Sequence, residues 1–174
     1  MSTDSTRIHC TDCDYVYAEH YQPIELRCRT KSGVVSYYKA LSWCYDCNKI
    51  TYAEKLPDIE TVRSDYEDWL GNQRAGLIMR VLSRFDRQYQ EKLKFFHNRI
   101  AWREARTTPP HCLECGSKNL SILSFQAGSD HTAIAKGFQH SCGGILVHDH
   151  HDKTGIRYNF AKTVIWMDQQ GSKR

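Results

Sequence analysis

Three Cys-X-X-Cys pairs constrain this chain more than any other feature of its sequence. The pairs are Cys10 and Cys13, Cys44 and Cys47, and Cys112 and Cys115. Cys28 and Cys142 complete the eight cysteines of the 174 residues. Each pair closes a tight loop that points two thiolates at one ion, and pairs repeated at long spacing in a reducing compartment indicate metal sites. A secreted disulfide framework is the alternative.

The rest of the composition favours a cytoplasmic protein. The start, Met-Ser-Thr-Asp-Ser-Thr-Arg, has no apolar region that could act as a secretory signal. No run approaches the roughly 18 apolar residues of a membrane-spanning helix. The net charge of +4 and the pI near 8.6 permit contact with nucleic acid or an acidic partner but demand neither.

Residues 1–57 predict a first zinc site built on a β-hairpin. Cys10, Cys13, Cys44 and Cys47 supply the four sulfurs of a closed structural site. Between the two pairs, residues 23–29 and 34–43 predict strands on either side of a turn at residues 31–33. This arrangement resembles the zinc ribbon (rubredoxin-like) proteins at the level of fold. Cys28, inside the first strand, is expected to be a small buried residue.

Residues 58–108 predict a helical connector. Apolar residues recur in steps of three and four, and Gly71 and Gly76 weaken the middle. We expect a first helix to about residue 70, capped by Asp58 or Ser64, and a second over residues 75–106. The basic side chains at helical spacing are either a phosphate-contacting stripe or a solvated face with local ion pairs to Asp86 and Glu91. They are Arg80, Arg84 and Arg87.

Residues 109–174 predict a second zinc site with one ligand in question. Cys112, Cys115 and Cys142 supply three sulfurs, and His140 is the favoured fourth ligand because it stands two residues from Cys142. The other candidates are His111, His131 and His148. A site with only three protein ligands would hold water in the open position, which is the catalytic kind of zinc. A strand is expected over residues 120–125, and a loop over residues 127–136.

The last stretch predicts a hairpin of residues 145–150 and 156–167 with a turn at residues 151–155. Residues 147–157, Val-His-Asp-His-His-Asp-Lys-Thr-Gly-Ile-Arg, resemble the histidine-aspartate core of phage recombination endonucleases. The resemblance implies a histidine that activates water and an aspartate that holds a divalent metal. The second Cys-X-X-Cys pair of that core is replaced here by Tyr-Asn-Phe at residues 158–160. A solvated hairpin tip is the alternative explanation of the histidines.

Together these patterns predict an α+β protein with two zinc ribbons, at residues 1–57 and 109–174, joined by the helical segment 58–108. Two structural zinc ions are expected. The leading interpretation is a non-enzymatic protein-interaction module, an adaptor or a bacterial inhibitor of a partner protein, because aromatic residues exceed what two tiny cores need. The alternatives are a nucleic-acid-binding protein and a metal-dependent nuclease acting through the segment from His148 to Asp152. The partner and the oligomeric state are left open.

Overall fold

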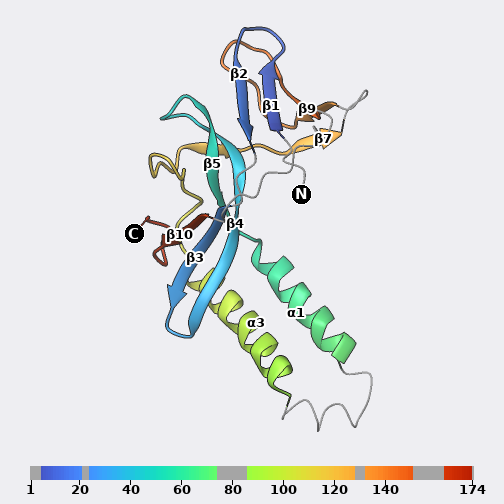
Figure 1. The fold of residues 1–174 in the computed structure, drawn as a ribbon, viewed down its shortest axis with the longest axis vertical. Coiled ribbons are helices and arrows are strands. Elements are labelled where there is room, and N and C mark those ends of the chain that lie inside the picture. Colours follow the sequence, from blue (N-terminus) through green and yellow to red (C-terminus); the bar gives the residue numbers. More distant parts are fainter. Residues whose placement is uncertain (1–4, 21–23, 74–85, 128–131, 151–162, 174) are drawn as a thin grey trace.

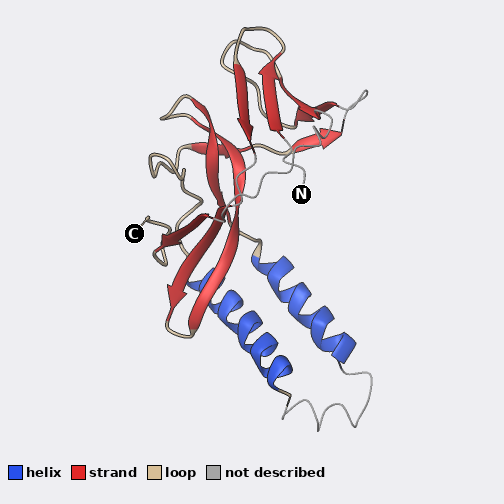
Figure 2. Cartoon of the chain, in the orientation of Figure 1, coloured by secondary structure: helices blue, strands red, loops and turns tan. Residues whose placement is uncertain are grey.

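The computed structural model describes residues 5–20, 24–73, 86–127, 132–150 and 163–173. In this part of the chain the fold is α+β, as predicted, with two five-stranded sheets and a pair of helices (Figure 2). The helices extend away from the sheets at one end of the molecule (Figure 1). None of the helices that are described is both long and apolar enough to cross a membrane.

Sheet one is antiparallel and takes strands from both ends of the chain. Its order is β2 (Val16–His20), β1 (Ser5–Cys10), β9 (Leu146–His150), β8 (Thr132–Ala135) and β7 (Phe125–Ala127). The register of β1 and β9 sets Cys10 opposite Leu146. The end of β1, with the first cysteine pair, therefore lies beside the loop that leads into β9.

Sheet two also draws on both ends of the chain. Its path is β10 (Thr163–Met167), β3 (Ile24–Thr30), β4 (Gly33–Cys44) and β5 (Lys49–Lys55), and β6 (Leu120–Ile122) pairs with the far end of β4. The hairpin of β3 and β4 around the predicted turn is confirmed. β10 joins β3 in parallel. Cys28 on β3 is fully buried, as predicted.

The helices α1 (Ile59–Gln73) and α3 (Arg87–Ala105) form a pair beside sheet two. Asp58 caps α1, since its carboxylate accepts from the Thr61 amide at 3.1 Å. The helix continues past the predicted end at residue 70, through Gly71. The predicted segment 75–85, with Gly76, Arg80 and Arg84, lies outside the described residues. Arg87 forms a local ion pair with Glu91 at 2.8 Å, as the solvated-face interpretation expects.

Two clusters of buried side chains make the core. One lies between the sheets and includes Ile8, Trp43, Ile50, Phe138 and Leu146. The other lies under sheet two and includes Leu26, Cys28, Val35, Tyr37, Trp102 and Met167. Trp102 joins α3 to the sheet, because its ring centroid is 4.7 Å from that of Tyr37.

The carboxy-terminal part differs from the prediction in three places. The predicted strand over residues 120–125 is divided between β6 in sheet two and β7 in sheet one, and the predicted loop over residues 127–136 contains β8. The predicted hairpin of residues 145–150 and 156–167 is wrong, because β9 pairs with β1 and β8 while β10 pairs with β3. Parallel pairing with β3 lets β10 bury Met167 in the second cluster. The division of the chain at residues 57 and 108 stays a prediction, although strand pairing crosses it.

Candidate metal centres

The cysteines and one histidine gather in two groups of four, which we name site A and site B. Site A consists of Cys10, Cys13, His140 and Cys142, and site B of Cys44, Cys47, Cys112 and Cys115. In each site the four ligand atoms all lie within 4.8 Å of one another. A tetrahedral zinc with bonds near 2.3 Å needs sulfurs roughly 3.8 Å apart, so both groups have the size of a zinc site. These are the only such groups of three or more ligand residues in the part of the chain that is described.

The sulfurs are positioned as metal ligands and not as disulfides. Cys10 Sγ lies 3.3 Å from Cys142 Sγ, and Cys44 Sγ lies 3.6 Å from Cys115 Sγ. A disulfide bond would bring two sulfurs to about 2.05 Å. None of the eight cysteines, all of which are described, is joined to another in a disulfide bond.

Site A joins the end of β1 to the loop between β8 and β9. Cys10 ends β1, and its amide closes a turn on the Tyr15 carbonyl at 3.0 Å that holds Cys13 beside it. The other two ligands lie in a turn in which the His140 amide donates to the Gly144 carbonyl at 2.9 Å. The imidazole presents Nδ1 to the sulfurs, 3.1 Å from Cys142 Sγ and 3.6 Å from Cys13 Sγ.

Aromatic rings and a glycine fix the shape of site A. The His140 ring is buried, with centroids 5.1 Å from Tyr15 and 5.0 Å from Trp43. Gly144 lies directly against the ligands, because a Cβ at this position would stand 2.5 Å from Cys10 Sγ. Only glycine fits this close approach.

Site B joins the turn between β4 and β5 to the segment before β6. Cys44 ends β4. Asn48, directly after Cys47, adopts the left-handed backbone conformation at φ +50°, which asparagine tolerates better than most residues. Cys112 lies beside β5 through a bridge to Ala53, and the Thr51 hydroxyl is 3.3 Å from its sulfur. Hydrogen bonds to a ligand sulfur support the thiolate form.

The thiols of site A cannot all ionise without a cation. The hydrogen bond from His140 lowers the pKa of Cys142 to about 6. The Tyr15 amide acts to lower the pKa of Cys13, but burial and the neighbouring sulfurs raise it to about 11. One thiolate therefore suppresses the next, because like charges a few ångströms apart repel.

Site B has the same electrostatic demand. Burial acts to raise the pKa of Cys112, but the Thr51 hydroxyl and backbone amides lower it to about 7. Hydrogen bonding with Cys115 raises the pKa of Cys47, and burial raises that of Cys44. A divalent cation would offset part of this negative charge and let the thiols of one site ionise together, so the donor sets of both sites fit a bound zinc ion.

The structure corrects how the predicted ligands are grouped. The prediction placed Cys10 and Cys13 with Cys44 and Cys47, whereas the structure places Cys10 and Cys13 with His140 and Cys142. The reason is the strand pairing: β1 lies against β9, and β4 lies against β6. Each predicted half-site therefore combines with a half-site from the other predicted ribbon.

The alternative histidines lie elsewhere. His111 Nδ1 faces the Gly171 carbonyl at 3.0 Å, and the His148 ring lies 5.4 Å from that of Phe125. His131 is outside the described residues, as are residues 151–157 of the segment that resembles the endonuclease core. Within the described part of that segment, Asp149 pairs with His9 at 3.2 Å.

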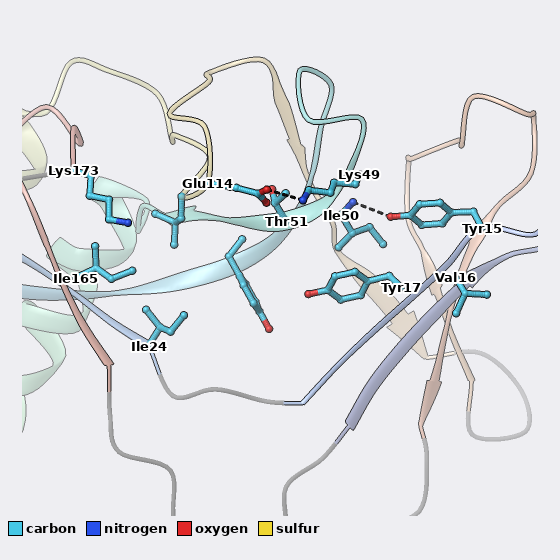
Figure 3. Close-up of a pocket in the computed structure, with 12 residues that line it drawn as sticks. Tyr15, Val16, Tyr17, Ile24, Lys49, Ile50, Thr51, Glu114, Ile165 and Lys173 are labelled. Carbon is cyan, nitrogen blue, oxygen red and sulfur yellow. Dashed lines mark hydrogen bonds and ion pairs between the residues drawn. The ribbon is translucent and has the colours of Figure 1, made fainter.

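A groove between the sheets is the feature that sequence patterns did not predict. This inter-sheet groove has a volume of about 730 Å³. Figure 3 shows Tyr15 and Tyr17 on one wall and Ile24 and Ile165 on the other. The remaining lining residues are Val16, Lys49, Ile50, Thr51, Tyr52, Leu113, Glu114 and Lys173. Alternation of apolar and polar residues along the sequence predicts strands at several of these positions. The groove itself depends on how the two sheets pack against each other, which no local pattern predicts.

Two interactions join residues that line the groove. Lys49 forms an ion pair with Glu114 at 2.6 Å, and the Tyr15 hydroxyl accepts from the Ile50 amide at 2.9 Å (Figure 3). Comparison of the chain with models of protein families, with curated proteins and with solved structures gives no match.

Proposed function

We propose that this protein is a non-enzymatic interaction module, built on two structural zinc ions, that binds an extended segment of a partner protein in the inter-sheet groove. The resemblance to zinc ribbons belongs to this proposal. Each site offers four protein ligands, which fill the tetrahedral shell of zinc and leave no position for a reactive water. Zinc therefore holds the fold together, and function resides in the surfaces it positions.

The observation that carries the proposal is that two sheet edges border the groove. β2 is an edge strand of sheet one, and β5 is an edge strand of sheet two. Consecutive residues of each line the groove: Val16 and Tyr17 of β2, and residues 49–52 of β5. Neighbouring residues of a strand point to opposite faces, so a strand that contributes both must present its edge. The edge of β2 can take an added strand, whereas the edge of β5 is already partly used, because the Ile50 amide donates to the Tyr15 hydroxyl.

The side chains around these edges suit a protein segment. Tyrosines and aliphatic residues dominate the lining, and tyrosine is among the residues that anchor interfaces. Val16 is 51% exposed at the mouth of the groove. Beyond Tyr52 the edge of β5 is already covered, because the Leu113 amide donates to the Tyr52 carbonyl at 2.8 Å. The groove therefore has a defined end and room for a short extended segment.

Site-directed crosslinking tests the proposal. A photo-reactive phenylalanine analogue at Tyr17 is expected to crosslink one partner in extract of the source cells, and mass spectrometry maps the attached peptide. Val16→Asp should abolish this capture while both zinc ions are retained, because the carboxylate would be desolvated by an apolar segment. The matched control is Ile134→Asp on β8, which is 43% exposed and lies on the same sheet outside the groove.

The control variants distinguish specific binding in the groove from non-specific capture. Ile134→Asp should capture the partner as well as the unmodified chain does. Equal capture by Val16→Asp would contradict binding in the groove. Loss of capture in both variants would show that any new charge on sheet one is harmful, and would remove the support for this site.

A further inference from the structure

The outer face of sheet two carries aromatic and basic side chains in alternation. Tyr37 identifies the inner face of the sheet, because its ring packs on Trp102 of α3. The residues on either side, Ser36 and Tyr38, therefore point outward. The strand register extends this outer face across the sheet: Ser36 lies opposite Arg27, Arg27 opposite Trp166, and Tyr38 opposite Lys55.

These outward side chains are accessible. Tyr38 is 72% exposed, the most exposed of the large hydrophobic residues that are described, and Val34 is 48% exposed. Arg29 and Lys55 are exposed as well. We name this surface, formed by Arg27, Arg29, Tyr38, Lys55 and Trp166, the outer aromatic face.

The charge of the outer aromatic face is positive. Among the described strand residues, one carboxylate shares this face with the three cations, that of Glu25, which pairs with Arg27 at 3.0 Å. The Arg29 guanidinium lies 4.9 Å from the centroid of the Trp166 ring. Stacking on an indole holds a guanidinium flat while its in-plane N–H donors stay suited to phosphate.

We propose that the outer aromatic face binds single-stranded nucleic acid. Tyr38 and the pair of Trp166 and Arg29 offer surfaces on which bases stack, and the Arg29 and Lys55 cations contact the phosphates. Two strand spacings of about 4.8 Å and a two-residue offset of about 6.8 Å put the backbone positions of Tyr38 and Trp166 roughly 12 Å apart. A ligand of several nucleotides is needed to span them.

The observations favour nucleic acid over an acidic peptide at this face. A carboxylate-rich peptide needs only the cations and gains nothing from the flat, exposed phenol ring of Tyr38. Single-stranded nucleic acid uses both, because every base has an aromatic face and every nucleotide a phosphate. A nucleic-acid duplex, whose bases are already stacked on one another, would use only the cations.

Fluorescence anisotropy with labelled 20-nucleotide strands of RNA and of DNA, titrated with the zinc-loaded protein, tests the proposal. Tyr38→Ala should weaken binding about 5- to 150-fold, the range for loss of one stacked base. Arg29→Glu should weaken binding and make the slope of log affinity against log salt shallower by about 0.7, the value for one phosphate contact. The matched controls are Phe95→Ala, at a residue 40% exposed on α3, and Arg87→Glu, at a side chain 91% exposed on the same helix.

The outcomes separate this surface from the groove. Binding that Tyr38→Ala and Arg29→Glu weaken while both α3 controls keep it supports the proposal, whether RNA or DNA binds better. No binding at 50 mM salt overturns it, as does equal weakening by the α3 controls. Displacement of the strand by poly-glutamate at equal charge concentration would also overturn it, in favour of an acidic protein. Val16→Asp, a change in the groove, should leave nucleic-acid binding unchanged. A failure of the nucleic-acid proposal would therefore leave the proposal of partner binding in the groove standing.

Discussion

Site A and site B each join segments that are far apart in the sequence, but their surroundings differ. Site A has three thiolates and one imidazole, and two aromatic rings enclose the imidazole. Site B has four thiolates, with the Thr51 hydroxyl on one sulfur and the Lys49 ammonium nearby. Glu114 makes the largest contribution to raising the pKa of Lys49, and Cys47 and Cys112 raise it further. With zinc bound, site B carries one more negative charge than site A.

The difference in charge between the two sites matches the difference in their surroundings. The neutral imidazole lets site A be enclosed by apolar rings, whereas the extra thiolate of site B calls for hydrogen-bond donors and a cation. The two sites also close loops of different length, since Cys10 and Cys142 are 132 residues apart and Cys44 and Cys115 are 71 apart.

The largest effect is expected from paired cysteine substitutions, which distinguish the two possible groupings. Cys10→Ser with Cys142→Ser removes two ligands of site A, so native mass spectrometry should find one zinc ion per chain. Cys10→Ser with Cys44→Ser removes one ligand from each site and should leave none. Each lost ion removes on the order of 10 to 16 kcal/mol of binding free energy that supports folding.

The grouping by sequence order makes the opposite prediction. If Cys10 and Cys44 shared an ion, their joint replacement would leave one zinc, and replacing Cys10 with Cys142 would leave none. Zinc counts in that order would overturn sites A and B as described. Cys28→Ser serves as the control, because Cys28 is buried within sheet two and belongs to neither group.

The second effect concerns the side of the molecule that holds site B. The buried Glu54 carboxylate accepts from the Tyr37 hydroxyl at 2.7 Å, from the His111 amide at 3.1 Å and from the Arg106 guanidinium. His111 directly precedes Cys112. Arg106→Ala would leave the carboxylate buried without its cation, so we expect a loss of about 3 to 5 kcal/mol in the free energy of unfolding. Denaturant titration measures this loss.

The same variant sharpens the comparison of the sites. A chelator should remove zinc from site B of Arg106→Ala at a lower concentration, with site A unchanged. The double variant Glu54→Gln with Arg106→Met removes both charges and should recover part of the lost stability. Equal weakening of both sites would show that the network supports the whole fold and not site B.

The eight residues that gather in sites A and B could be predicted from the sequence, and their grouping could not. A Cys-X-X-Cys pair marks two ligands by local geometry, and His140 is marked by its nearness to Cys142. Which pair joins which depends on the contact of β1 with β9, and no local pattern encodes that pairing. The β3–β4 hairpin was predictable because its turn and both strands are contiguous. β10 was misplaced because a parallel partner is remote by necessity.

The third effect tests the close packing of site A through Gly144→Ala. The added Cβ would stand 2.5 Å from Cys10 Sγ and 3.0 Å from the Asp12 amide nitrogen, so the ligand or the backbone must move. We expect a loss of about 1 to 3 kcal/mol, seen as weaker zinc binding at site A alone. Gly116→Ala is the comparison at site B, where open space surrounds the position but φ is +76°. It should cost about 1 kcal/mol of folding free energy through backbone strain, with the zinc affinity of site B retained.

The smallest effect tests whether Lys49 offsets the extra charge of site B. Lys49 and Glu114 are both about half exposed, so removing the ammonium in Lys49→Gln should weaken zinc at site B by less than about 1 kcal/mol. Competition with a chromophoric chelator at low salt measures the change, and 0.5 M salt should abolish it. Glu114→Gln separates two explanations, because it frees the ammonium from its carboxylate partner. Slightly tighter zinc at site B in this variant would show that Lys49 acts on the thiolates, whereas weaker zinc would show that the ion pair holds the Cys112 loop in place.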